Sequence, residues 1–218
     1  IVLAIILGAF FFSRRDAGLE EPLPAIDDSS QHENVTKRPT LPGEEKNLAD
    51  VGSFHPPLPR ADERVTKKPF GIFITPKNSP VQPEKFSGYH TGTDFEIFLE
   101  EAGSEVVVQA VCTGKIAEKR SATGYGGVVI QSCLLNDEPI TVIYGHLKLA
   151  SVPKKIGNEL KAGESIGALS AANSAEAGGE RKHLHLGFHR GENVNILGYV
   201  QDKDKLSDWI DPCLYVCR

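Results

Sequence analysis

The sequence predicts a mainly β fold, in which an antiparallel sheet is accompanied by few, short helices. Three observations support this prediction. From Phe70 onward, β-branched and aromatic residues gather in short runs, and Gly, Pro, Asn or Asp separates each run from the next. Amphipathic helical periodicity is scarce. A stretch of about 150 residues can bury close to 70% of the surface that its unfolded chain exposes, so this part of the chain can fold alone.

The expected strands follow one another along this stretch. They are residues 71–75, 94–98, 105–111, 115–118, 127–132, 141–144, 165–169 and 184–188. One short helical turn is expected near residues 207–210.

The turn at residues 122–125 should fold its flanking strands into a hairpin. Cys112 then falls opposite Cys133 within one residue, close enough for a disulfide. Closing that loop would stabilise the fold by roughly 3 kcal/mol. The alternative is that both thiols are free and buried. Cys213 and Cys217 could also form a local bridge, although four-residue spacing on a regular helix favours none. No cysteine pair has the C-x-x-C spacing of a zinc knuckle or a thioredoxin-like motif.

The chain opens with an apolar run at residues 1–12, followed by Arg14 and Arg15. Twelve residues span about 18 Å as a helix, short of a bilayer core of roughly 30 Å. The sequence contains no Met, so we expect the run to be the truncated end of a signal peptide or a membrane anchor. A buried core helix is the alternative, which the lack of a polar face disfavours. The two arginines alone would favour a cytoplasmic location for the residues after them, whereas the cysteines favour export.

Residues 13–66 are predicted to form a disordered linker, rich in proline and acidic residues, that precedes a domain at residues 67–218. The linker range holds seven of the fourteen prolines and few large apolar residues, which is too little apolar surface to offset chain ordering. His32 and His55 lie there without ligand spacing and are expected to be solvated. A net charge of −5 with no basic patch argues against a nucleic-acid partner.

Four of the seven histidines suggest a metal site. His90 and Asp94 form an H-x3-D unit, His183 and His185 form an H-x-H unit, and His146 stands between them. Side chains two apart on a strand share a face, so His183 and His185 can point into one site. Two imidazoles and one carboxylate can hold Zn²⁺ with a fourth position left for water. The two remaining imidazoles suit acid–base chemistry, which favours an enzyme over a structural zinc site.

Further stretches strengthen this pattern and carry a family resemblance. Residues 103–110 correspond to a strand, residues 113–116 to the glycine turn after it, and residues 124–130 to the start of another strand with the sequence Gly-Tyr-Gly. Residues 143–147 contain a Tyr-x-His-Leu motif. Glycines follow in turns at positions 157, 163 and 167, and Asp211-Pro212 closes the set. Together with the metal units, they resemble the lysostaphin-type (LytM-type) zinc metallopeptidases. These endopeptidases cut peptide cross-links in bacterial peptidoglycan. The resemblance covers roughly residues 68–215.

The resemblance implies a role for each residue of the site. His90, Asp94 and His185 would bind one Zn²⁺ per chain, on the floor of a groove in one sheet. His146 and His183 would be the catalytic pair beside a metal-activated water. No motif residue is missing. A non-catalytic cell-wall-binding or hydrolase-activator domain is the alternative, and loss of ligands would be its expected sign.

The resemblance also implies a location and partners. Peptidoglycan stem or cross-bridge peptides would be the substrate, and the protein would work in the cell envelope outside the cytoplasm, either secreted or attached to the membrane through residues 1–12. The chain departs from the family in a Thr-rich stretch between His90 and Asp94, in its four cysteines, and in a long loop at residues 171–182. These departures bear on the choice of substrate more than on the chemistry.

Other zinc hydrolase patterns fit less well. The chain has no H-E-x-x-H motif. Glu180 and His183 do form the E-x-x-H of a D-Ala-D-Ala peptidase or Hedgehog-like site. That pattern also needs a carboxylate seven residues after its first histidine, where Ile97 stands. His189 shares the parity of His185, but it would lie some 13 Å away along a strand and is predicted to be a rim histidine.

Overall fold

The computed structural model describes residues 54–218. The expected signal peptide or anchor at residues 1–12, and the linker as far as residue 53, lie outside the described residues. Among residues 54–218, no helix is both long and apolar enough to span a bilayer.

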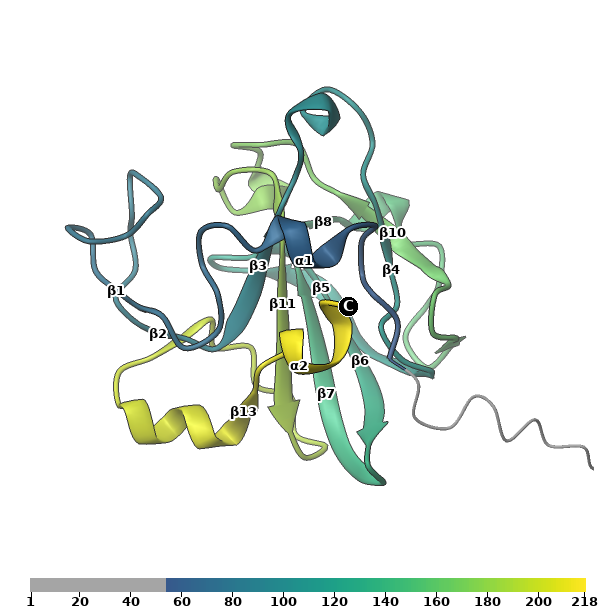
Figure 1. Cartoon of the computed structure of the whole chain (residues 1–218). Coiled ribbons are helices and arrows are strands. Elements are labelled where there is room, and N and C mark those ends of the chain that lie inside the picture. The colour runs from purple at the N-terminus through teal and green to yellow at the C-terminus, as the bar shows by residue number, and fades with distance from the viewer. Residues whose placement is uncertain (1–53) are drawn as a thin grey trace, which may run out of the picture. The chain divides into compact units, whose positions relative to one another are not determined.

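A large antiparallel sheet occupies the centre of the domain (Figure 1). Its strands are β3 (Gly92–Glu96), β5 (Gly114–Ala122), β6 (Gly126–Leu135), β7 (Glu138–Gly145), β9 (Glu159–Leu160), β11 (His183–Arg190) and β13 (Trp209–Ile210). They run in the order β13-β11-β7-β6-β5-β9, and β3 also pairs with β11.

Two smaller antiparallel sheets complete the strand framework. Their strands are β1 (Phe73–Ile74), β2 (Gly88–His90) and β12 (Tyr199–Val200), in the order β1-β2-β12, and β4 (Val107–Gln109), β8 (Leu147–Lys148) and β10 (Ser165–Leu169), in the order β4-β10-β8. The helices of the described part are short. They are α1 (Ala61–Arg64), α2 (Cys213–Val216) and the 3-10 helices Leu99–Glu101, Leu149–Ser151, Ala175–Ala177 and Lys203–Asp208.

The structure confirms the predicted mainly β fold with antiparallel sheets. The expected strands all occur, and the one at residues 165–169 has the predicted bounds. The central strands are longer than expected, and five strands of two or three residues were not predicted: β2, β8, β9, β12 and β13. The helical turn expected near residues 207–210 is a 3-10 helix ending at Asp208, and the chain then becomes extended as β13.

Strand β11 separates the core from the site. Leu184, Leu186 and Phe188 are fully buried in the main hydrophobic cluster, while His183 and His185 emerge on the other face, as their alternation predicts. The strand is hydrogen-bonded on both sides, to β3 and to β7. Its histidines are therefore held by a rigid element.

The β5–β6 hairpin and its disulfide are also confirmed. Ala122 pairs with Gly126 across the turn, and a register shift between Ile116 and Glu118 changes the pairing further along the strands. Cys112 and Cys133 form a disulfide with their Cα atoms 6.2 Å apart.

Cys213 and Cys217, for which sequence left both states open, are bridged as well. Helix α2 ends at Val216, and Cys217 has left the helical conformation with φ −97° and ψ 50°. The objection based on a regular helix therefore does not apply.

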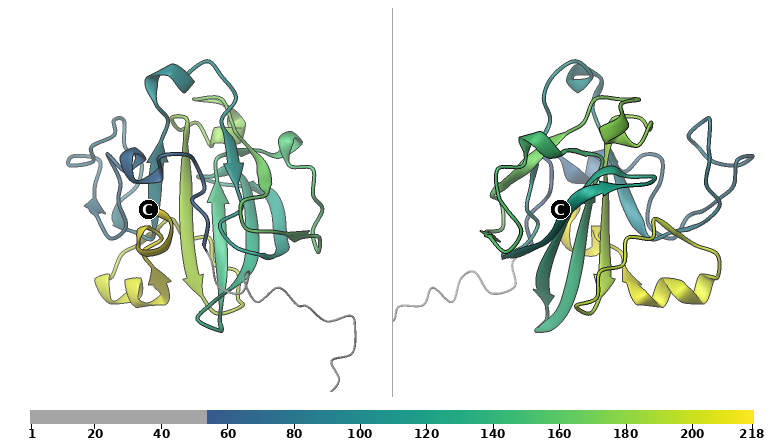
Figure 2. Two further views of the ribbon diagram at one scale, coloured as in Figure 1. Left: turned by 45° about the vertical axis from the view of Figure 1, so that its right-hand side comes forward. Right: turned by 180° about the vertical axis from the view of Figure 1, so that it is seen from behind.

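The folded domain begins earlier than the expected boundary between linker and domain at residues 66 and 67. Residues 54–66 form an arm that lies against the sheet and against α2 (Figure 2). The Phe54 ring packs on Phe188, with ring centroids 5.5 Å apart, and Leu58 is fully buried. His55, expected to be solvated, is half-buried and its backbone N–H donates to Val111.

Arg64 explains why a segment so poor in apolar residues can be ordered. Its guanidinium is buried and binds both carboxylate oxygens of Glu101, at 2.7 and 2.8 Å. It also donates to the backbone carbonyls of Pro59 and Glu96. The arm is therefore fixed by buried polar bonds as well as by its few apolar side chains.

Candidate metal centre

Strand pairing brings the predicted site residues together. Between β3 and β11, Asp94 pairs directly with His185. On the other side of β11, His185 pairs with Gly145, the last residue of β7, so His146 follows immediately beside the same point. His90 ends β2, two residues before β3 begins. Residues far apart in the sequence thus meet at one place on the sheet.

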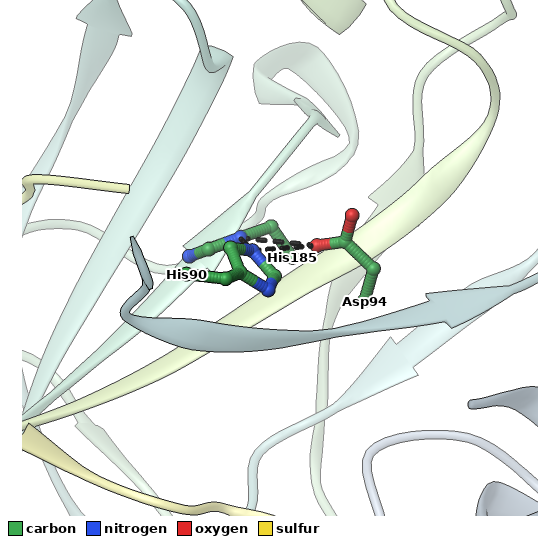
Figure 3. Close-up of side chains that lie close together, drawn as sticks. All are labelled: His90, Asp94 and His185. Atoms are coloured by element: carbon green, nitrogen blue, oxygen red, sulfur yellow. Dashed lines mark hydrogen bonds and ion pairs between the residues drawn. The ribbon is translucent and has the colours of Figure 1, made fainter. Parts of the chain in front are cut away.

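His90, Asp94 and His185 present three atoms toward a common point (Figure 3). His90 Nε2 lies 3.1 Å from His185 Nδ1 and 3.3 Å from Asp94 Oδ1, and His185 Nδ1 lies 3.1 Å from Asp94 Oδ1. Tetrahedral ligands with bonds of 2.0–2.1 Å are separated by roughly 3.3 Å. All three side chains are buried. Their spacing therefore fits the ligand set of a zinc ion.

The second nitrogen of each ligand histidine has its own partner. His90 Nδ1 lies 3.3 Å from the carbonyl oxygen of Pro69, and His185 Nε2 lies 3.1 Å from the hydroxyl of Tyr125. A proton on each of these nitrogens would be shared with that partner, which leaves a lone pair on His90 Nε2 and on His185 Nδ1. These are the two atoms that face Asp94.

Electrostatics keep two of the three groups in the form that binds a metal. Burial alone would raise the pKa of Asp94, but the nearby imidazoles of His183, His90 and His185 favour the ionised carboxylate and lower its pKa well below the usual range. Burial lowers the pKa of His185 to about 4, although the adjacent Asp94 carboxylate opposes the shift. At neutral pH the carboxylate is ionised and this imidazole is neutral, as metal ligands must be.

His146 and His183 lie side by side next to the triad. Their ring centroids are 4.3 Å apart, and His183 Nε2 is 3.3 Å from Asp94 Oδ2. His146 Nδ1 bonds to the carbonyl of Ala177 at 3.0 Å, and His183 Nδ1 to that of Arg181 at 2.9 Å. Both Nδ1 atoms are therefore occupied, and each ring turns its Nε2 away from these carbonyls, that of His183 toward Asp94 Oδ2. Burial, and then the charge of His183, lowers the pKa of His146 well below its usual value, so this imidazole is neutral.

His146 also has an unusual backbone. Its φ of 64° lies in the left-handed region, which a side chain other than glycine seldom adopts. The N–H and the hydroxyl of Ser170 both donate to the carbonyl of His146, at 2.9 and 2.8 Å. These bonds stabilise the turn that follows β7, and the contact of Nδ1 with the carbonyl of Ala177 fixes the direction of the imidazole.

The site opens into a cavity of about 380 Å³. Its wall includes Asp94, His146, His183 and His185 together with Lys68, Phe86, Ser87, Thr123, Gly124, Tyr125, Glu180, Arg181, Ile196, Leu197, Gly198, Tyr199 and Gln201. His90 lies behind this wall, with 1% of its side chain exposed. A water molecule or a peptide can thus reach the two remaining histidines and the open side of the triad.

Sequence reasoning did not single out four residues of this site: Lys68, Tyr125, Arg181 and Tyr199. Tyr125 stood inside the Gly-Tyr-Gly stretch, and its spacing before the histidines gave no sign of a contact with His185. Lys68 and Tyr199 come from the two ends of the domain and meet at 3.1 Å only in the folded chain.

Two other predictions concern residues near the site. His189 lies against Trp209, with ring centroids 4.8 Å apart, and is not part of the triad. Glu180, the carboxylate of the rival E-x-x-H pattern, lies 3.4 Å from Lys85. Within residues 54–218, the group that could hold a metal consists of His90, Asp94 and His185.

The chain is similar to known proteins in sequence and in fold. Residues 88–196 match the family model of peptidase family M23. Among solved structures, CbpA from L. salivarius REN is similar, with a TM-score of 0.50 and 22% identity over 75% of this chain and 94% of that chain. LytU gives a TM-score of 0.45 and 23% identity over 70% of this chain and 83% of that chain. No curated protein sequence matches the chain.

The match to Csd3 of Helicobacter pylori covers 76% of this chain but only 35% of that one, with a TM-score of 0.45 and 20% identity. The present chain thus spans about a third of the Csd3 chain. The matched region at residues 88–196 contains all five histidine and aspartate residues that the sequence singled out. The chain therefore belongs to peptidase family M23, the LytM-type family that its motifs resemble.

Proposed function

We propose that this protein is a zinc-dependent endopeptidase that hydrolyses the peptide cross-links of bacterial peptidoglycan. The observation that carries the proposal is the convergence of three ligand atoms, 3.1–3.3 Å apart, beside two further imidazoles in one cavity. Membership of a peptidase family supports the reaction class and the peptidoglycan substrate.

His90 Nε2, Asp94 Oδ1 and His185 Nδ1 would hold the zinc ion. When bound, zinc supplies a Lewis acid that polarises a carbonyl and lowers the pKa of water toward 7 from about 15.7. Every other task falls to side chains and backbone groups of this chain. Tyr125 and the Pro69 carbonyl hold the two ligand imidazoles in their orientation.

His146 and His183 would handle protons at their Nε2 atoms. The neutral His146 is suited to accept a proton from the attacking water. A proton on His183 Nε2 would face Asp94 Oδ2, and from there it could be given to the oxyanion or the leaving amine. The rings are 4.3 Å apart, so both can act on one substrate carbonyl.

We also propose that the protein works outside the cytoplasm, in the cell envelope. The disulfides Cys112–Cys133 and Cys213–Cys217 suit an oxidising compartment. Whether residues 1–12 act as a cleaved signal or as a retained membrane anchor can be decided from the mass of the mature N-terminus.

The test compares variants that separate metal binding from chemistry. Asp94→Ala and His185→Ala should lose zinc and activity, because two remaining ligands hold the ion much less tightly. His146→Ala and His183→Ala should keep zinc while muropeptide release falls about 100-fold or more. His189→Ala, on the same strand but outside the triad, is the matched control and should retain both.

Zinc content, melting temperature and muropeptide release are measured on all five variants. Full activity in a folded His146→Ala would remove that residue from the mechanism, and loss of zinc there would make it a ligand. Wild-type protein that binds sacculi but releases no peptide would instead be the non-catalytic cell-wall-binding domain.

A further inference from the structure

The two oxygens of Asp94 have different partners. Oδ1 faces His90 Nε2 and His185 Nδ1, whereas Oδ2 accepts a hydrogen bond from Arg181 Nη2 at 2.8 Å. His183 Nε2 also lies 3.3 Å from Oδ2. A carboxylate whose second oxygen is held in this way offers a metal one oxygen rather than two.

Arg181 is itself held by a second carboxylate. Its Nε lies 2.9 and 3.0 Å from the two oxygens of Glu96, and its Nη2 lies 2.5 Å from Oε1. Glu96 and Asp94 are two residues apart on β3 and therefore share a face of the strand. The planar guanidinium bridges them, which a lysine ammonium could not do with the same geometry.

The charges of this arrangement balance. The guanidinium of Arg181 is positive, and alone it would repel a divalent cation held by Asp94. Glu96 carries one negative charge against it, and the side chains of Arg181 and Glu96 are only 17% and 11% exposed. The ammonium of Lys67 also lies 3.4 Å from Glu96, but its side chain is 43% exposed, so salt and water largely screen its charge. The bridge can therefore orient Asp94 without adding net charge to the centre.

We propose that Arg181 is a positioning residue for the metal centre: it occupies Asp94 Oδ2, so that Asp94 presents Oδ1 alone to the metal, and Glu96 holds it there. This inference rests on the proposed zinc site. The residue lies outside the H-x-H unit, in the loop that the sequence marked as unusually long, so the bridge gives that loop a role in shaping the ligand set.

The experiment measures zinc affinity by competition with a chelator, together with the visible spectrum of the Co²⁺-loaded protein. R181Q should bind zinc about 10- to 100-fold more weakly. Its Co²⁺ absorption should also weaken, because an Asp94 that is free to bind through both oxygens raises the coordination number. R181K keeps the charge but not the bridge and should fall between R181Q and the wild type. R190Q, at the far end of β11, is the matched control and should equal the wild type.

The double variant E96Q/R181Q separates position from charge. By charge alone, R181Q should bind zinc more tightly than the wild type, because a positive charge near the cation is lost. The double variant, which loses one charge of each sign, should by charge alone bind zinc as the wild type does. Positioning requires that the double variant stay about as weak as R181Q. Restored affinity in the double variant, or wild-type affinity and spectrum in R181Q, would overturn the inference.

Folding is checked by the melting temperature of the metal-free proteins. If R181Q does not fold, the zinc affinity and the Co²⁺ spectrum of R181K and of the double variant test the inference instead. Wild-type protein that binds no zinc would overturn the proposed site and this inference together. Wild-type binding with no response to R181Q would overturn the inference alone.

Discussion

Replacing Arg64 by Met tests whether the arm at residues 54–66 is part of the cooperative fold. The Arg64 side chain is 1% exposed and makes two hydrogen bonds to Glu101. It makes two more to the carbonyls of Pro59 and Glu96. Met is shorter than Arg but has a comparable volume, adapts its shape, and carries no polar atom that needs a partner, so the substitution removes these bonds without leaving a large cavity.

The expected loss depends on the groups that the substitution leaves unpaired. Removing one partner of a buried ion pair destabilises a protein by about 3–5 kcal/mol. The Glu101 side chain is 23% exposed and can be partly hydrated in the variant, which places the loss near the lower end, at about 3 kcal/mol. For a domain of this size, the melting temperature should fall by roughly 6–12 °C.

Urea and thermal unfolding measure both quantities. The matched control is Arg60→Met, because Arg60 lies just before the same helix and its ion pair with Glu63 is exposed. This control should leave the melting temperature almost unchanged. If Arg64→Met melts at the same temperature as Arg60→Met, the arm does not contribute to the cooperative fold and our account of its attachment is refuted.

Two further predictions concern the disulfides and pH. Replacing Cys112 and Cys133 by Ser should lower the free energy of unfolding, measured in urea, by about 3 kcal/mol, and the same replacement of Cys213 and Cys217 should lower it by about 2 kcal/mol. The difference is expected because the first bridge spans 21 residues of sequence and the second only 4. A larger loss for the second pair would contradict the loop-closure argument. Burial alone would raise the pKa of Glu84, but hydrogen bonds from Lys68, the Phe86 backbone and Ser79 lower it below 4.5, so the stability it contributes is present above that pH and is lost as pH falls through the folded value. Melting temperatures between pH 7 and pH 3 should fall less steeply below about pH 4.5 in Glu84→Gln than in the wild type, and parallel curves would show that this carboxylate is not linked to folding.

The site was the part of the molecule most open to prediction. The H-x-H unit specified which face of β11 carries the two histidines, because Leu184 and Leu186 alternate with His183 and His185. The β-branched runs of the central strands were likewise long enough to be recognised. These features depend on residues that are close together in the sequence, so they can be recognised before the fold is known.

The features missed depend on distant partners. Strands of two or three residues such as β12 have no pattern of their own, and they exist because Tyr199 meets His90 across the fold. Arg64 looks like a surface residue until Glu101, 37 residues away, is placed beside it. Proline suggested a linker at residues 54–66, yet a proline keeps its carbonyl, and that of Pro57 accepts a hydrogen bond from Gln109.

The segment just before β1 limits how far the domain can be shortened. The carbonyl of Pro69 faces His90 Nδ1, and the carbonyl of Lys68 accepts a hydrogen bond from the backbone of Asp94 at 3.0 Å. Both acceptors lie some twenty residues ahead of the region that matches the family, which starts at residue 88. A fragment or chimera cut to residues 88–196 would carry every proposed ligand and both histidines of the proposed catalytic pair, yet it would lack the groups that contact two of those ligands. A fragment designed to keep the site should therefore contain all of residues 54–218, including the proline-rich arm at residues 54–66.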